Sequence, residues 1–222
     1  VLRSNMEFML AAQKDRNVFI LTSFNPGSGK SFLAMNIAMS FAIKMKRVLV
    51  IDGDLRHGST SSYVNSPGTG LSDYLRGMTD NCKKLIVPDD KYEKFHILPI
   101  GKVPPNPTEL LENGRLAGLI EHLRGEYDFI FIDCPPIDIV ADAQILEKAA
   151  DRTLFIVRAG LLDRSMLSEL ETIYQEKRFK NLSVILNGTE STGGRYSYRY
   201  GYRYGYHYGY ASYYGSKKNN EM

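Results

Sequence analysis

The segment Phe24-Asn25-Pro26-Gly27-Ser28-Gly29-Lys30-Ser31 decides how this chain of 222 residues is expected to fold. An apolar run at residues 18–22 precedes it, and a helix-like segment follows it. A phosphate-binding loop requires this order, because its glycines turn backbone amides inward and the helix start adds about half a positive charge. The segment therefore predicts nucleotide binding. A glycine turn that only caps a helix is the simpler alternative, and Phe24 stands where the usual pattern has its first glycine.

The residues of this loop have separate expected roles. Lys30 would reach the β- and γ-phosphates, and the hydroxyl of Ser31 would bind magnesium. ATP and Mg²⁺ are therefore the expected cofactors. The residues expected to contact the nucleotide are contiguous: Pro26, Gly27, Ser28, Gly29, Lys30, Ser31 and Phe32.

Apolar runs alternate with helical segments along the rest of the chain. Uninterrupted apolar strands between helices indicate crossover connections and a parallel sheet that is covered on both sides. The expected fold is therefore α/β: a P-loop NTPase-like parallel β-sheet flanked by helices on both faces. The predicted strands are 18–22, 47–51, 95–100, 129–132, 153–157 and 182–186; the predicted helices are 1–14, 31–44, 71–75, 109–112, 116–123, 141–148 and 165–177; residues 57–70 are a predicted loop.

Acidic residues follow two of the predicted strands, at the sheet edge where ligands bind in such folds. Asp133 ends one strand, and Asp52 and Asp54 follow another. Two residues apart on an extended chain, Asp52 and Asp54 would point the same way, so that one could bind a metal while the other accepts a proton. Arg56 is expected to pair either with these carboxylates or with phosphate.

The C-terminal segment has a different composition from the rest of the chain. From residue 193 onward it carries a net charge of +4, so that the body carries −1 of the overall +3 and offers no basic nucleic-acid face. Its low complexity predicts a disordered tyrosine-rich tail at 188–222 after a P-loop domain at 1–187. Ten tyrosines lie in this tail: Tyr196, Tyr198, Tyr200, Tyr202, Tyr204, Tyr206, Tyr208, Tyr210, Tyr213 and Tyr214.

Other features of the sequence restrict the class of protein. Cys82 and Cys134 lack metal-ligand spacing, so reduced thiols are expected. No apolar run approaches the length of about 20 residues that crosses a bilayer, so this chain alone is expected to be soluble. Val1 starts in mid-pattern, which is typical of a piece of a longer protein.

Three motifs together resemble those of the bacterial protein-tyrosine kinases (BY-kinases) of polysaccharide export. The loop at 24–31 is similar to their Walker A, the stretch Val48-Leu-Val-Ile-Asp-Gly-Asp-Leu-Arg56 to their Walker A′, and Phe129-Ile-Phe-Ile-Asp-Cys-Pro-Pro136 to their Walker B. Residues 98–101 and 104–111 resemble a further family stretch, and the terminal tyrosines resemble the autophosphorylation cluster.

The resemblance implies an ATP-dependent tyrosine autokinase that phosphorylates its tail tyrosines in trans and regulates polysaccharide polymerisation and export. Lys30 would bind phosphates, Asp52 would be the base, and Ser31, Asp54 and Asp133 would bind Mg²⁺. The implied partners are further copies of the chain in a ring, a membrane-embedded chain-length regulator, fused or separate, and a phosphotyrosine phosphatase. The implied location is the cytoplasmic face of the bacterial inner membrane.

One departure from the family concerns assembly. The family's ring motif, Glu-x-x-Arg-x-x-Arg, is represented here only by its end, with Arg3 as the last arginine.

Two other functions remain as alternatives. A MinD/ParA-type nucleotide-switched ATPase shares the three motifs, but its signature lysine, five residues before the loop lysine, is Asn25 here. Alternatively, the Arg-Tyr tail could bind RNA or polysaccharide by stacking.

Overall fold

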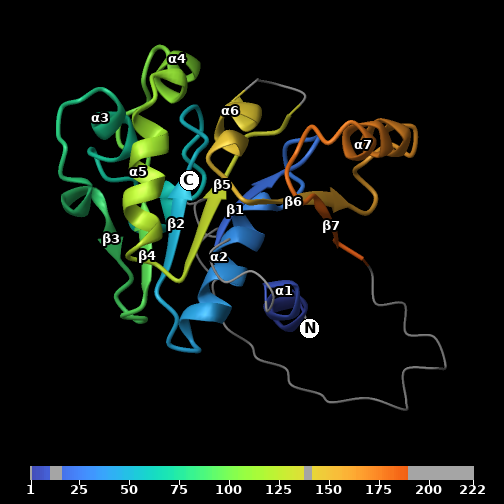
Figure 1. Ribbon diagram of the computed structural model, residues 1–222, viewed down its shortest axis with the longest axis horizontal. Helices are drawn as coiled ribbons and strands as arrows, with labels where there is room; N and C mark the ends of the chain where they lie inside the picture. The colour runs from blue at the N-terminus through green and yellow to red at the C-terminus, as the bar shows by residue number, and fades with distance from the viewer. Residues whose placement is uncertain (1, 11–16, 138–141, 190–222) are drawn as a thin grey trace, which may run out of the picture. The chain divides into compact units, whose positions relative to one another are not determined.

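The computed structural model describes residues 2–10, 17–137 and 142–189, which belong to one compact unit, Val1–Thr189. A seven-stranded sheet in the order β3-β4-β2-β5-β1-β6-β7 runs through its middle (Figure 1). The central strands β1 (Val18–Thr22) and β2 (Val48–Asp52) are buried at every residue. Such strands read as continuous apolar runs because both of their faces are covered.

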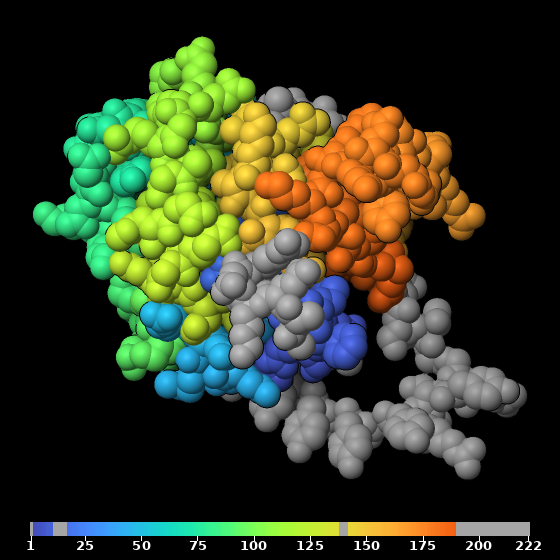
Figure 2. Space-filling model, in the orientation of Figure 1, coloured from blue at the N-terminus to red at the C-terminus, as the bar shows by residue number. Residues whose placement is uncertain are grey.

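Helices cover the two faces of the sheet in separate layers. Side chains on one face, such as Phe19 and Phe131, pack with α1 (Leu2–Leu10) and α2 (Lys30–Ala42). Their strand neighbours Ile20 and Ile132 face the other layer. This second layer consists of α3 (Leu71–Leu75), α4 (Pro107–Glu112), α5 (Arg115–Arg124), α6 (Asp142–Lys148) and α7 (Met166–Gln175). Figure 2 shows α5, α6 and α7 of this layer at the surface, in yellow-green, yellow and orange.

The remaining strands continue the parallel pairing. They are β4 (Phe95–Leu98), β5 (Phe129–Asp133), β6 (Arg152–Arg158) and β7 (Ser183–Asn187), and each lies close to its predicted range. In the described part of the chain, no helix combines the length and apolar content that crossing a bilayer requires. Cys82 and Cys134 are both buried and free.

The sheet differs from the prediction at one edge. β3 (Val87–Pro88) pairs antiparallel with β4, so the sheet is mixed rather than purely parallel. Two residues give no periodicity that a sequence pattern could reveal, and proline is tolerated there because an edge strand needs no donor on its outer side. The predicted loop at 57–70 also contains a 3₁₀ turn, Ser61–Val64.

The chain ends lie partly outside the described residues. α1 ends at Leu10, and residues 11–16 are not described, so the predicted end of this helix at residue 14 is not tested. In α1, Met6 is buried, whereas Met9 is 36% exposed. The tail tyrosines all lie outside the described residues, and the domain boundary at 187 stays a prediction.

Candidate active site

The phosphate-binding loop joins β1 to α2 at the carboxyl edge of the sheet. Gly27 and Gly29 have φ of 74° and 93°, the left-handed region in which a Cβ is unfavourable. Alternation of such residues forms a concave nest of amides that binds anions. Among the described residues, the amides of Gly27, Ser28 and Gly29 donate to no protein acceptor. The first turn of α2 contains no acidic residue that would offset the positive end of the helix.

Phe24, which replaces the usual first glycine, anchors this loop in the core. Its side chain is 1% exposed, and its ring packs edge-on against Phe155 with the centroids 4.9 Å apart. Packing against Phe155 therefore explains why phenylalanine replaces glycine at position 24: its ring anchors the start of the loop in the core.

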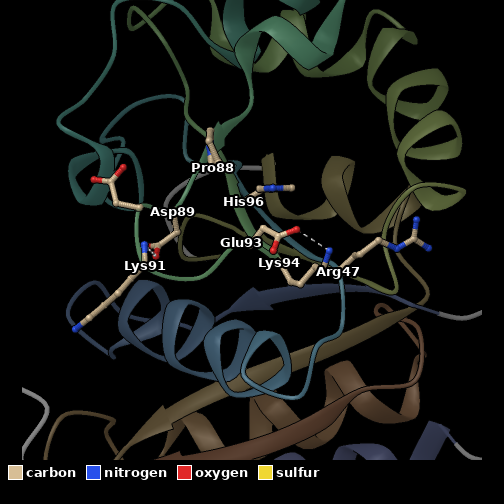
Figure 3. A pocket seen from close by; sticks show the side chains of 8 residues that line it. Arg47, Pro88, Asp89, Lys91, Glu93, Lys94 and His96 are labelled. Atoms are coloured by element: carbon tan, nitrogen blue, oxygen red, sulfur yellow. Dashed lines mark hydrogen bonds and ion pairs between the residues drawn. The ribbon is translucent and has the colours of Figure 1, made fainter.

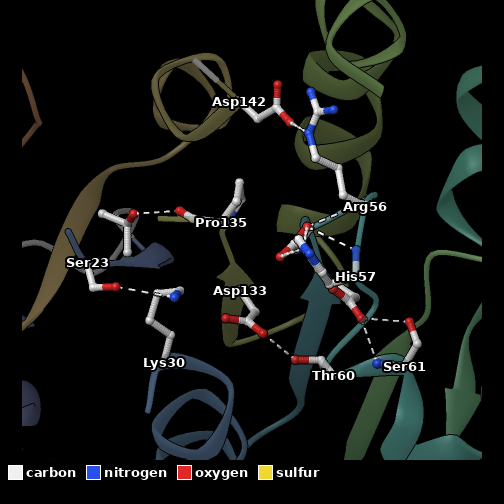
Figure 4. A network of polar contacts seen from close by, with 12 residues as sticks. Ser23, Lys30, Arg56, His57, Thr60, Ser61, Asp133, Pro135 and Asp142 are labelled. Atoms are coloured by element: carbon white, nitrogen blue, oxygen red, sulfur yellow. Dashed lines mark hydrogen bonds and ion pairs between the residues drawn. The ribbon is translucent and has the colours of Figure 1, made fainter. Parts of the chain in front are cut away.

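Lys30 is the buried cation of the loop. Its Nζ donates to Ser23 Oγ at 3.2 Å (Figure 4). Burial lowers the pKa of Lys30, and the nearby charges of Asp133 and Asp54 partly oppose this effect. Ser23 in turn donates to the carbonyl oxygen of Asn25 at 2.8 Å, as does the hydroxyl of Ser28. A buried ammonium whose protein partner is a neutral hydroxyl has donors left for an anion.

Asp52 and Asp133 lie side by side, because β2 and β5 pair in a register that places these residues opposite each other. Ser61 donates to Asp52 Oδ2 from its amide at 2.6 Å and from its hydroxyl at 2.7 Å. Thr60 donates to Asp133 Oδ2 at 2.7 Å. Oδ1 of each aspartate is buried without a hydrogen-bond partner among the described residues. Two orphaned acceptors beside an amide nest are the arrangement that a metal ion and its waters would satisfy.

The protonation of this pair is strongly perturbed. Burial raises the pKa of Asp52 to about 7, and the charges of Asp133 and Asp54 act in the same direction. Burial also raises the pKa of Asp133, although the hydroxyls of Thr60 and of nearby Ser31 and the charge of Lys30 oppose the shift. The predicted proximity of Ser31, Lys30 and Asp133 is therefore present in the structure.

Asp54 lies at the rim of the same cluster. It is 8% exposed, whereas Asp52 is 0% exposed. Asp54 Oδ1 accepts from the amides of Arg56 and His57, each at 3.2 Å, and His57 Nδ1 lies 3.2 Å from Asp54 Oδ2. In the described residues, no three acidic, histidine or cysteine side chains form a complete metal site. Mg²⁺ usually keeps several waters and takes one or two carboxylates plus substrate phosphates.

Arg56 pairs with a carboxylate that the sequence did not single out. It donates from Nε to Asp142 Oδ2 at 3.2 Å and from an Nη to Thr108 Oγ1 at 2.9 Å. Thr108 donates to the other oxygen of Asp142 at 2.6 Å. The expected pairing of the Arg56 guanidinium with the strand-end carboxylates is absent from the described residues, because its carboxylate partner is Asp142 of α6. Pairing with phosphate stays a prediction. Sequence reasoning also missed Thr60 and Ser61, which orient the two buried aspartates.

The side chains of Phe32 and Pro26, both predicted nucleotide contacts, are exposed. Phe32 is 59% exposed on the first turn of α2. Gly27, Ser28 and Gly29 form the nest, Lys30 is the buried cation, and Ser31 is half-buried near Asp133.

A surface pocket of about 570 Å³ lies at the opposite edge of the sheet (Figure 3). Two of its residues directly precede β2 and β4, so the pocket is at the amino ends of the strands. Its lining has three basic and three acidic side chains and therefore no net positive charge for phosphate. The lining residues are Arg47, Pro88, Asp89, Asp90, Lys91, Glu93, Lys94 and His96.

Comparison with known proteins identifies the family. A family model described as an AAA domain matches residues 17–180. The tyrosine-protein kinase CpsD of Streptococcus agalactiae serotype III is 32% identical over 197 residues, which cover 88% of this chain and 83% of CpsD. The chain belongs to the bacterial tyrosine-protein kinases. The predicted family and enzyme class, protein-tyrosine kinase, are therefore confirmed.

Other bacterial tyrosine kinases match over similar lengths of this chain. The Escherichia coli ETK kinase domain has 33% identity and a TM-score of 0.78, and the match covers 90% of this chain and 78% of that one. The tyrosine-protein kinase wzc of Salmonella typhimurium is 36% identical over 209 residues, which cover 89% of this chain and 28% of wzc. The septum site-determining protein MinD of Pyrococcus horikoshii, at 23% identity and a TM-score of 0.62 over 77% of this chain and 69% of that one, shares the fold alone.

Proposed function

We propose that this tyrosine kinase transfers the γ-phosphoryl group of ATP to tyrosines of the C-terminal cluster of a neighbouring copy. The observation that carries the proposal is the convergence, at one sheet edge, of an open amide nest, a buried lysine and two aspartates with unpartnered oxygens. A dense run of tyrosines follows the last strand of the same chain. Phosphoryl transfer requires chiefly that charge and geometry be arranged around the phosphates, and these groups supply both.

The residues of the site divide the binding of the phosphates between them. The amides of residues 27–31 and the ammonium of Lys30 would hold the phosphate oxygens. Mg²⁺, held by Ser31, Asp54 and Asp133, would neutralise part of the charge on the phosphates when bound. The orphaned oxygen of Asp133 and the proximity of Ser31 support this assignment.

Asp52 is the proposed base for the incoming tyrosine. Its pKa of about 7 lies near the operating pH, which suits a group that must both accept and release a proton. The tyrosine oxygen forms the new bond to the γ-phosphorus, and the bond from that phosphorus to the bridging oxygen breaks. ADP leaves, and the phenolic proton passes to Asp52. Because Asp52 is fully buried, the turn that carries Ser61 must open for this contact.

The proposed setting is polysaccharide export at the cytoplasmic face of the inner membrane. This chain matches only 28% of wzc, as expected if wzc carries a kinase domain within a longer protein. CpsD, in contrast, is of similar length to this chain. A membrane-embedded chain-length regulator, fused or separate, would therefore hold several copies together, and a phosphotyrosine phosphatase would reverse the modification.

The test is incubation with Mg-ATP followed by anti-phosphotyrosine blotting, with Lys30→Met as the inactive control. To test transfer in trans, Lys30→Met protein serves as the acceptor for an active variant in which the tail tyrosines are replaced by phenylalanine. Phosphotyrosine on the Lys30→Met chain is the expected result. Absence of phosphotyrosine from the wild-type protein would contradict the kinase proposal, and its absence from the mixture alone would contradict transfer in trans.

A further inference from the structure

Side chains at the ends of β6 and β7 donate hydrogen bonds to two carbonyl groups of the phosphate-binding loop. Arg158, the last residue of β6, donates from Nη1 to the carbonyl oxygen of Gly27 at 2.6 Å. Asn187, the last residue of β7, donates from Nδ2 to the carbonyl oxygen of Ser28 at 3.0 Å. Arg158 and Asn187 are themselves opposite each other in the pairing of the two strands.

These contacts determine which way the loop amides point. In a planar trans peptide the C=O and the following N–H lie on opposite sides. A donor that fixes the Gly27 carbonyl outward therefore directs the Ser28 amide inward, and the same holds for the Ser28 carbonyl and the Gly29 amide. Both amides belong to the nest and have no protein acceptor among the described residues.

Charge and close packing add to this effect. The guanidinium of Arg158 forms no ion pair with the residues that the structure describes, so its positive charge stands directly behind the nest. The Asn187 amide packs so tightly that a Cβ at Gly29 would collide with it. Gly188, at φ 68°, lies against the Arg158 side chain, where a Cβ would be 3.2 Å from Cγ.

We propose that Arg158 and Asn187 are positioning residues that pre-organise the phosphate-binding loop for nucleotide phosphates. They act through the backbone, because their donors bind carbonyl oxygens of the loop. Pre-organised donors bind an anion more tightly, since the loop loses less conformational freedom on binding. The inference rests on the proposed function only in that the loop binds nucleotide.

The test compares Arg158→Met and Asn187→Ala in the full 222-residue chain by calorimetric titration with ADP and with pyrophosphate in the presence of Mg²⁺. We expect about tenfold weaker binding for Arg158→Met and about fivefold for Asn187→Ala, because a charge-assisted hydrogen bond is stronger than a neutral one. Arg158→Lys, which keeps the charge, should recover most of the loss. In kinase assays KM for ATP should rise, while kcat at saturating ATP should stay within about twofold.

A matched control is Asn113→Ala, which removes a hydrogen bond of the same kind, from Asn113 Nδ2 to the Leu75 carbonyl at 2.7 Å, outside the site. It should leave the affinity for ADP unchanged. If Asn187→Ala does not fold, Asn187→Leu, which keeps a similar shape and removes the donor without adding a charge, replaces it. Folded variants that bind ADP and pyrophosphate as tightly as the wild type would overturn the inference, as would an equal loss in Asn113→Ala. ADP binding without any tyrosine phosphorylation would refute only the proposed kinase function.

Discussion

Replacing Asp52 by asparagine should stabilise the nucleotide-free protein at alkaline pH while removing tyrosine phosphorylation. Burial, with help from the charges of Asp133 and Asp54, raises the pKa of Asp52 from 3.8 to about 7 in the folded protein. Between these two values the unfolded chain has released the proton and the folded chain still holds it, so the free energy of unfolding falls as the pH rises. Above about pH 7 the folded protein carries the full cost of burying the ionised Asp52 carboxylate. The difference between the two pKa values corresponds to at most about 4 kcal/mol in the free energy of unfolding.

Asparagine keeps an acceptor for both hydrogen bonds from Ser61 and carries no charge. The variant should therefore be more stable than the wild type by about 1 to 4 kcal/mol near pH 8.5, and the difference should shrink as the pH falls toward about 4. The assay is urea unfolding in EDTA at several pH values between these limits. Asp163→Asn is the control, because hydrogen bonds from Ser165 lower the pKa of this exposed carboxylate. That replacement should not stabilise the protein.

The reasoning is refuted if Asp52→Asn is less stable than the wild type at alkaline pH, or if the difference does not change with pH. A stable variant that still phosphorylates tyrosine at the wild-type rate would leave the electrostatic argument intact and remove Asp52 from the role of base. Stability gained by removing an active-site charge is a common trade-off in enzymes.

Three further predictions concern packing, an ion pair and assembly. Phe24→Gly, which restores the usual loop pattern, should lower the free energy of unfolding by about 3 to 5 kcal/mol through loss of the Phe155 contact, and calorimetric titration with ADP should show no gain in affinity. Arg56→Met should cost about 2 kcal/mol in urea unfolding because it leaves Asp142 buried without its ion pair, whereas Arg47→Met at an exposed pair should cost less than about 1 kcal/mol. Phosphate adds about −1.5 to −2 charge per tyrosine, so three additions exceed the tail's charge of +4, and phosphorylation should disfavour ring assembly. Equal sedimentation of phosphorylated and unphosphorylated protein that carries the complete Glu-x-x-Arg-x-x-Arg segment would contradict this last prediction.

The strands and the nucleotide loop could be predicted because their signals are local. Buried parallel strands appear as uninterrupted apolar runs, and β1 and β5 are buried almost throughout. The glycine loop is specified by a few adjacent residues whose backbone angles only glycine adopts readily, as at Gly29. The acidic residues at the two strand ends could be placed together because adjacent parallel strands end at the same edge.

The contacts that tune the site could not be predicted, because they join residues far apart in the sequence. Arg56 and Asp142 are separated by 86 positions, and Thr60 reaches Asp133 across 73. Nothing in the local pattern of Thr60 distinguishes it from the other polar residues of its loop. Pro88 was missed for a different reason, since a two-residue edge strand has too short a pattern to detect.

The place where the chain leaves the folded body has a consequence for how the acceptors are selected. Asn187 contacts the nucleotide loop directly, and the first tail tyrosine, Tyr196, follows nine residues later. Nine residues span at most about 30 Å when fully extended, and longer segments of chain connect Asn187 to the later tyrosines. This length of chain does not by itself keep the tail tyrosines, the proposed acceptors, from the site of their own molecule, so reach alone does not favour the proposed transfer to a neighbour. Preference for a neighbour must come from how copies are oriented in the assembly, and dilution of the protein should slow the reaction in proportion to the loss of that assembly.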